Sequence, residues 1–207
     1  MIIPCFTNRK AIPSLVAAAV ALFSLIAPNA VQAAETTDEV LAVSVSNFEC
    51  VSKNLYRGAQ PSHKALEQLA KGGVRTIIDL RQEGSSSDKE SEYAQQLGMN
   101  YVHIPLGLKH APSDKIAQAV SAVINPINQP VYVHCRQGAD RTGTVCAVYR
   151  RLVHGWTYEK AYGEMRKHHF KPFLVGMKKI VKECDSKEFS NQMTIPVASL
   201  APKSTQL

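Results

Sequence analysis

Hydrophobic residues recur along the chain at two spacings, and these predict alternating strands and helices. Short apolar runs such as Val74–Leu80 and Pro130–Val133 have the length and the β-branched content of buried strands. Polar stretches between them carry apolar residues at helical spacing, as in Thr144–Val153. Strands that alternate with helices form a mostly parallel sheet with helices on its faces, so we expect a single α/β domain. The expected strands lie near 55–57, 74–80, 101–104 and 130–133, and the expected helices near 62–71, 88–97, 114–124, 144–153, 157–168 and 173–186.

The first 33 residues have the pattern of a cleaved secretory signal. A positively charged start precedes an apolar stretch over 11–27, and Val31-Gln32-Ala33 fits a small-residue cleavage site. An uncleaved membrane anchor is the alternative, but the apolar run is short and contains Pro13. We expect cleavage, which would place the protein in a bacterial periplasm or outside the cell with no stable membrane insertion.

The rest of the chain divides into three segments by composition. Residues 34–50 are polar and are expected to form a weakly structured N-terminal lead-in. Residues 51–190 hold the predicted strands and helices and are long enough for one domain with a real core. Residues 191–207 combine prolines with small polar residues, a composition typical of a flexible tail.

The charge balance is basic, at +7 for the whole chain. Loss of residues 1–33 would leave 22 basic and 17 acidic residues, a net charge of +5. Such a charge attracts anionic, phosphorylated substrates. Nucleic acid is a poor alternative, because no basic run interleaved with aromatic residues and no recognition motif is present in the sequence.

The segment that follows the strand near 130–133 has the spacing of a phosphate-binding nucleophile loop. Five residues separate Cys135 from Arg141, and a helix-like pattern follows. A strand, a tight loop and a helix direct backbone N–H groups and the positive helix end at one anion. The glycines Gly138 and Gly143 let the backbone curl closely around it. The same dipoles, together with Arg141, favour the thiolate form of Cys135.

Each residue of this loop has a chemical interpretation beside a structural one. Cys135 would attack phosphorus as the nucleophile, although many lone cysteines only pack at strand ends. Arg141 would hold two phosphate oxygens with its planar fork; a merely structural arginine is disfavoured in the first turn of a helix. The Thr142 hydroxyl is placed to bond the sulfur, or else to cap the helix. The residues expected to contact the phosphate are Arg136, Gln137, Gly138, Ala139 and Thr142.

The motif His134-Cys135-x-x-Gly138-x-x-Arg141-Thr142-Gly143 resembles the signature of the cysteine-dependent protein tyrosine phosphatase superfamily, in particular its compact dual-specificity-like branch. The stretches Asn54–Ser62 and Gly73–Arg81 are similar to the opening strands of small atypical members. The resemblance covers about 54–170 and implies a dual-specificity phosphatase-like fold and a phosphocysteine intermediate. Rhodanese-type loops are one residue shorter, and low-molecular-weight phosphatases carry the motif near the N-terminus.

The general acid does not follow from the resemblance. The family places an aspartate about thirty residues before the cysteine; here the matching position after Ile104-Pro105 is Leu106. Asp140, inside the loop, is the favoured candidate, because some related lipid-active phosphatases carry an aspartate there. Asp114 is the other candidate, although it equally suits the first turn of a helix. The histidines His103 and His110 are close in sequence but are more simply structural.

The resemblance leaves the substrate open among phosphotyrosine or dual-specificity protein substrates, phosphoinositides and inositol polyphosphates. Arg136, Lys109 and His110 could add charge at the rim of the pocket, or be ordinary surface. A second hypothesis is a catalytically weak module that captures phosphate groups, suggested by Leu106 in place of an acid.

The cysteines are too few for a disulfide scaffold, but an oxidising compartment would permit a bridge between Cys50 and Cys184. Cys146 lies on the helix after the loop and is expected to be packed. No Cys/His spacing in the sequence suggests zinc, and the chemistry implied requires no metal or other cofactor.

Overall fold

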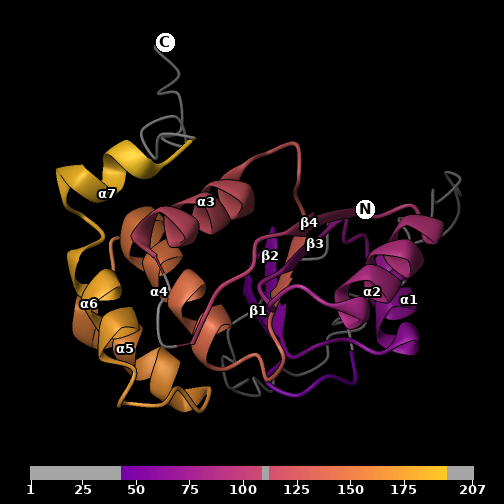
Figure 1. The fold of residues 1–207 in the computed structure, drawn as a ribbon, viewed down its shortest axis with the longest axis horizontal. Coiled ribbons are helices and arrows are strands. Elements are labelled where there is room, and N and C mark those ends of the chain that lie inside the picture. The colour runs from indigo at the N-terminus through magenta and orange to yellow at the C-terminus, as the bar shows by residue number, and fades with distance from the viewer. Residues whose placement is uncertain (1–42, 109–111, 195–207) are drawn as a thin grey trace, which may run out of the picture.

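The computed structural model describes residues 43–108 and 112–194 (Figure 1). The expected signal segment, most of the lead-in, nearly all of the expected tail, and the rim residues Lys109 and His110 lie outside the described residues. Within the described ranges, no helix is both long and apolar enough to cross a membrane.

Five short strands form one sheet at the centre of the domain. They are β1 (Glu49–Ser52), β2 (Leu55–Gly58), β3 (Thr76–Asp79), β4 (Asn100–His103) and β5 (Val131–His134), in the spatial order β1-β2-β5-β3-β4. The pairs β2–β5, β5–β3 and β3–β4 are parallel, and only β1 pairs antiparallel with its neighbour. The expected mostly parallel α/β sheet is therefore confirmed, with β5 in the middle.

Helices cover both faces of the sheet (Figure 1). On one face lie α1 (His63–Lys71) and α2 (Ser85–Gln96). On the other lie α3 and α4, with the remaining C-terminal helices packed beside them. These helices are α3 (Ser113–Ile124), α4 (Asp140–His154), α5 (Tyr158–Lys167), α6 (Val175–Glu183) and α7 (Lys187–Gln192).

The alternation of side chains along the strands builds two cores. Successive residues of a strand point to opposite faces. Accordingly Ile78 and Val133 pack with α3 and α4, whereas Ile77 and Tyr132 pack with α1. All four are fully buried, so β3 and β5 are covered on both sides, as expected of central parallel strands. This burial fixes the strand ends from which the active-site loop leaves.

Several elements differ from the sequence-based expectation. Helix α2 begins at Ser85 instead of near 88, because the serines that read as a loop form its first turn and bond to residues of β3 and beyond. Helix α4 begins at Asp140, four residues earlier than its apolar periodicity indicated. The strand β1 and the helix α7 were not predicted from the pattern.

The hypothesis of a Cys50–Cys184 bridge is wrong. Cys184 is a free, fully buried thiol at the end of α6, and its Sγ donates to the carbonyl oxygen of Val181 at 3.3 Å. Packing of α6 against α4 accounts for its burial without a covalent bond. Cys146 is also free and buried in α4, which confirms the expected packing role.

Candidate active site

Cys135 follows the last residue of β5, at the carboxyl end of the parallel strands. Strand β5 pairs with β2 and β3, and Cys135 is 2% exposed. The loop 135–139 turns directly into α4, whose first residues are buried. This is the strand–loop–helix arrangement expected from the sequence, and it places the sulfur at the helix end that carries partial positive charge.

Three successive carbonyl oxygens of the loop are held from outside. A trans peptide points each C=O and the following N–H in opposite directions, and Gln129-Pro130 is the one cis bond among the described residues. The N–H groups of residues 137, 138 and 139 therefore face the inner side of the loop, where they form an anion-binding nest. The donors on the outer side are Gln60 N to Arg136 O at 3.3 Å, Asn47 Nδ2 to Gln137 O at 2.8 Å, and Arg57 Nη2 to Gly138 O at 2.6 Å.

Gly138 is required at its position for two reasons. Its φ is +67°, a left-handed conformation that favours glycine, and an added Cβ would lie 2.4 Å from the carbonyl carbon of Gly58. The loop therefore packs directly on the backbone at the end of β2. Its curvature follows from this contact.

Arg141 is anchored by backbone carbonyls. One terminal nitrogen, Nη1, donates to Leu80 O at 3.2 Å and to Leu106 O at 3.4 Å. The residue is 9% exposed, and its buried Nε makes no hydrogen bond to any described residue. The guanidinium is thus fixed on one side, with donors left for a planar, bidentate contact to an oxyanion.

Leu106 stands where the family places its general acid, and the structure explains what it does instead. Its side chain is fully buried in the core beneath α3 and α4, and its carbonyl oxygen accepts from Arg141. The position contributes a backbone acceptor and apolar packing to the site, and no proton donor.

The two aspartates considered as general acids, Asp140 and Asp114, differ in burial. Asp140 is buried in the first turn of α4; its Oδ1 accepts from the Lys171 backbone N–H at 2.9 Å, and its Oδ2 lies 3.5 Å from Lys171 Nζ. Asp114 is exposed in the first turn of α3. Of the histidines, His103 is half-buried with Nε2 at 2.9 Å from Arg81 O, which is a structural contact.

The Thr142 hydroxyl makes no hydrogen bond to the sulfur in this structure. Its Oγ1 is buried and makes no hydrogen bond to any described residue, Cys135 included. Arg136 and Gln137 are exposed on the loop, whereas Gly138 and Ala139 are buried.

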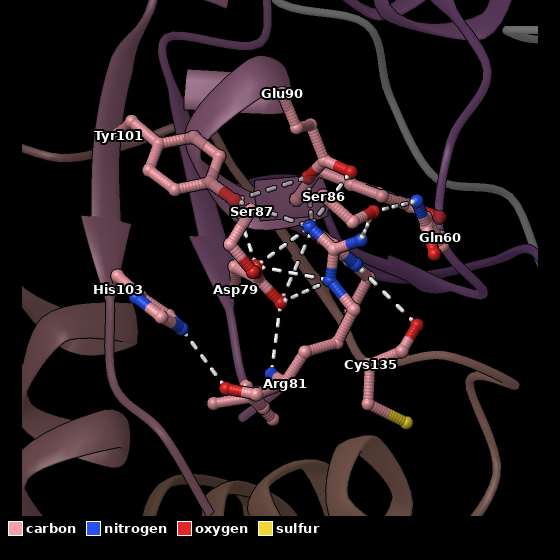
Figure 2. Close-up of polar contacts among 12 residues, drawn as sticks. Gln60, Asp79, Arg81, Ser86, Ser87, Glu90, Tyr101, His103 and Cys135 are labelled. Carbon is pink, nitrogen blue, oxygen red and sulfur yellow. Dashed lines mark hydrogen bonds and ion pairs between the residues drawn. The ribbon is translucent and has the colours of Figure 1, made fainter. Parts of the chain in front are cut away.

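Behind the loop lies a buried network of charged side chains (Figure 2). The guanidinium of Arg81 contacts Asp79 at 2.8 Å and Glu90 at 3.0 Å. His134 Nε2 lies 2.7 Å from Glu90 Oε1, an ion-pair distance, although the pair lacks the alignment of a hydrogen bond. Ser87 and Tyr101 donate to Asp79 from α2 and β4. In Figure 2 the Cys135 sulfur points away from this network.

The network determines the ionisation of its members. Burial by itself would raise the pKa of Asp79, but hydrogen bonds from Arg81 and the charge of His134 outweigh it and hold this pKa well below its usual range. Burial and the nearby carboxylates of Glu90 and Asp79 raise the pKa of Tyr101, so that its phenol stays protonated and donates.

Asp79, Glu90 and His134 also form the one trio, among the residues that the structure describes, whose ligand-type atoms all lie within 4.8 Å of one another. Both carboxylates already contact the Arg81 guanidinium, so a cation is built into the cluster as a side chain. The trio is better explained as a charge-compensated network than as a metal centre.

Comparison with known proteins identifies the family of the chain. A sequence profile described as "DSP-PTPase phosphatase fused to NAD+ Kinase" matches residues 29–183. The chain belongs to this phosphatase family. It is thus a cysteine-dependent phosphatase of the dual-specificity-like branch, as the loop indicated.

The individual relatives have low sequence identity to this chain. The dual specificity protein phosphatase TpbA of Pseudomonas aeruginosa is 29% identical over 162 residues, which cover 73% of this chain and 70% of TpbA. The inositol diphosphatase SIW14 of Saccharomyces cerevisiae is 33% identical over 95 residues, 46% of this chain and only 28% of SIW14. The solved catalytic core of SIW14 in complex with citrate has a TM-score of 0.64 at 23% identity, covering 72% of this chain and 93% of that core, which shows the same fold.

Three residues that support the site were not predicted from the sequence. Arg57 and Asn47 hold loop carbonyls, and Glu90 contacts the histidine of the motif. Arg57 could have been noticed in the sequence because it is a charged residue within an otherwise apolar strand. Nothing in the local pattern distinguishes Glu90 from the exposed acidic residues around it.

Proposed function

We propose that this phosphatase hydrolyses phosphate monoesters of phosphotyrosine or dual-specificity protein substrates through a phosphocysteine at Cys135. The Cys135 thiolate attacks phosphorus, a sulfur–phosphorus bond forms, and the bond from phosphorus to the leaving oxygen breaks. Water then attacks the phosphocysteine, which releases inorganic phosphate and restores the thiolate. The observation that carries the proposal is the inward-facing nest of N–H groups in the loop that leads from Cys135, at the end of β5, to the anchored Arg141.

Arg141 and the loop amides are proposed to stabilise the charge that spreads over the phosphoryl oxygens during transfer. Nη1 is held by two carbonyls, so the guanidinium is oriented before the substrate binds. The exposed side chains of Arg136 and Gln137 border the same loop and are available to the rest of the substrate.

We propose Asp140 as the group that gives a proton to the leaving oxygen and later removes one from water. Its support is position: it is buried beside Arg141, and Leu106 has no proton to give. The contacts of its carboxylate with Lys171 favour a second role, in which Asp140 anchors the turn between α5 and α6. The two roles predict different kinetics for an Asp140→Asn variant.

An inositol polyphosphate or phosphoinositide substrate is the alternative. It is favoured by the 33% identity to a protein named inositol diphosphatase, and by Lys171, whose side chain is 43% exposed and whose ammonium lies beside Asp140. Multiply phosphorylated ligands gain from such additional positive charge.

A phosphate-release panel tests the proposal. We expect the highest kcat/KM on a phosphotyrosine peptide when it is compared with a phosphoserine peptide, a soluble inositol polyphosphate and a phosphoinositide in vesicles. Preference for an inositol ligand would transfer the assignment to the alternative. Release that persists in Cys135→Ser would contradict the mechanism itself. A burst of about one equivalent followed by negligible turnover would favour the weak capture module.

We also propose that residues 1–33 are removed during export to the periplasm or the exterior. The support is the charged start, the apolar stretch and the small-residue site in the sequence. Mass spectrometry of the protein purified from cell fractions tests this: a mature N-terminus at Ala34 in a non-cytosolic fraction is expected, and an intact chain in the cytosol would contradict it.

A further inference from the structure

We propose that His169 is a positioning residue for the phosphatase reaction, which acts by fixing the side chain of Asn47 against the nucleophile loop. The inference rests on the proposed phosphoryl transfer at Cys135 and deepens it. It adds the turn after α5 to the groups that shape the phosphate-binding nest.

Two hydrogen bonds in series connect the His169 ring to the nucleophile loop. Asn47 Nδ2 donates to Gln137 O at 2.8 Å, and Asn47 Oδ1 lies 3.0 Å from His169 Nδ1. The Gln137 carbonyl can only accept, so the amide nitrogen must face it and the amide oxygen must face the ring. His169 Nδ1 is therefore the donor. The neutral Nδ1–H tautomer and the imidazolium both supply this hydrogen, so the contact needs no charge on the ring.

Asn47 and His169 share a backbone conformation that is unfavourable for residues with a Cβ. Their φ values are +56° and +65°, and within the described ranges they are the only residues other than glycine with a positive φ. Asn and His tolerate this region better than most residues, but it still costs free energy, and residues held in it cluster at functional sites. Here the two are hydrogen-bonded to each other across 122 positions of sequence, beside the nucleophile loop.

The chain on both sides of His169 is firmly held. Phe170 is fully buried in the core, and His168 is hydrogen-bonded to Glu49 of β1. The backbone N–H of His169 itself donates to Arg166 O at 3.1 Å. The ring is thus presented to Asn47 by a backbone with little freedom, as the preorganisation of a site requires.

The same turn also holds the far end of the nucleophile loop. The backbone N–H of Lys171 donates to Asp140 Oδ1 at 2.9 Å, at the point where the loop enters α4. Residues 168–171 therefore brace the loop at two places, at Gln137 through Asn47 and at Asp140 directly. A single short segment thus fixes the loop from its middle to its junction with the helix.

The consequence for the reaction concerns the N–H of Gly138. While the Gln137 carbonyl is held outward, the N–H of the same peptide faces the phosphate side of the loop. Without the His169 ring, the Asn47 amide can rotate, and the carbonyl loses its fixed donor. Donors that are aimed in advance stabilise an oxyanion better than donors that must first reorient. We therefore expect weaker oxyanion binding and slower phosphoryl transfer.

The test compares His169→Gly with His169→Ala. Both variants remove the ring, but glycine adopts a positive φ readily, so the two differ in backbone strain. We expect both to bind tungstate, a tetrahedral dianion, about tenfold more weakly by calorimetry, below the about 100-fold effect of removing an oxyanion donor outright. The value of kcat/KM for p-nitrophenyl phosphate should fall by a similar factor in both, although His169→Gly unfolds at the higher urea concentration. Affinity that follows the urea midpoints, with His169→Gly close to wild type, would overturn the proposal.

His169→Asn is the conservative variant. Asparagine tolerates a positive φ, and its Nδ2 is attached to Cγ as Nδ1 is in histidine, so it can donate to Asn47 from about the same place. We expect most of the tungstate affinity to return. An affinity as low as that of His169→Ala would contradict the proposed hydrogen bond. His63→Asn, at an exposed histidine at the start of α1, is the control and should bind like the wild type.

A double-mutant cycle tests whether His169 acts through Asn47. Asn47→Gly removes the amide and retains access to the positive φ. His169→Gly added to Asn47→Gly should then cause little further loss of tungstate affinity, whereas additive losses would refute the proposal. A wild-type protein that binds tungstate but releases no phosphate from any ester would sink the proposed function alone, because the dependence of tungstate binding on His169 still decides this inference.

Discussion

The guanidinium of Arg57, buried in β2, donates a hydrogen bond of 2.6 Å to the carbonyl oxygen of Gly138 in the nucleophile loop. The two residues lie 81 positions apart in sequence and meet because β2 and β5 are paired in parallel. This bond turns the Gly138 carbonyl outward, so that the next N–H faces the phosphate side.

We predict that Arg57→Met lowers both activity and stability. Nε and Nη1 of Arg57 make no hydrogen bond to any described residue, so the main loss is the bond to Gly138, whose buried carbonyl is left unsatisfied at about 1–3 kcal/mol. Urea unfolding and phosphate release measure the two effects. Arg75→Met, at an exposed arginine, is the matched control. Full activity in Arg57→Met would contradict the role given to the bond.

Gly138→Ala should abolish most activity. The added Cβ would lie 2.4–2.5 Å from backbone atoms of Gly58 and Ala59, so the loop must move away from β2. Gly155→Ala provides the comparison, because Gly155 has a similar φ of +63° at the end of α4 but open space around it. That variant should lose about 1–2 kcal/mol of stability and keep its kcat. Equal activity in the two variants would show that the contact with β2 does not matter.

Asp140→Asn should slow the cleavage of phenyl phosphate much more than that of p-nitrophenyl phosphate. A poor leaving group needs a proton in the transition state, and a good one leaves without it. The measurement is kcat for both esters with the variant and the wild type. An equal loss on both would assign Asp140 the anchoring role with Lys171 in place of the acid role. Lys171→Met, which removes the ammonium but keeps the backbone N–H, is the companion variant.

Iodoacetamide should label Cys135 well before the buried thiols of Cys146 and Cys184. Burial raises the pKa of the Cys146 and Cys184 thiols to about 11, so near neutral pH only about one in 10⁴ of either is thiolate. Peptide mapping by mass spectrometry after short exposure gives the order of labelling. Early labelling of Cys146 would mean that α4 opens in solution.

Asp79→Asn should cost stability in a pH-dependent way. The pKa of Asp79 is depressed in the folded state, so its ionised form stabilises the fold above the ordinary carboxyl pKa of about 3.9, and this contribution is lost as the pH falls toward the folded value. The difference in unfolding free energy between wild type and variant is therefore greatest near neutral pH and shrinks below about pH 4. Asp88→Asn, at an exposed aspartate of α2, should show little such dependence. A constant difference for Asp79→Asn would contradict this sign.

The parts of the fold that the sequence predicted are those set by local pattern. The strands β3, β4 and β5 and most helices follow from apolar spacing, and the loop from the spacing of Cys135 and Arg141. The strand β1 escaped because two of its four residues are polar and it borders the sheet edge. The first turn of α2 escaped because consecutive serines favour loops in isolation, whereas here they satisfy Arg81 and Asp79.

The candidate site likewise has one part that the sequence reveals and one part that it does not. The residues that face the phosphate lie in one short segment and could be recognised together. The residues that hold this segment come from β2, α2 and the turn before β1, at separations of 44 to 90 positions. Their partners are set by tertiary packing, which a single sequence does not reveal.

The hydrogen bonds that anchor Arg141 determine which sequence changes the protein can tolerate during evolution. Its two acceptors are main-chain oxygens, those of Leu80 and Leu106. Substitution of either leucine by another apolar residue keeps the oxygen in place, so drift at these positions leaves the arginine aligned. In the segment between β3 and α3, an insertion or deletion immediately beside Leu80 or Leu106 would displace the oxygen of that residue. The segment is thus expected to tolerate exchange of side chains much better than a change in length at these positions.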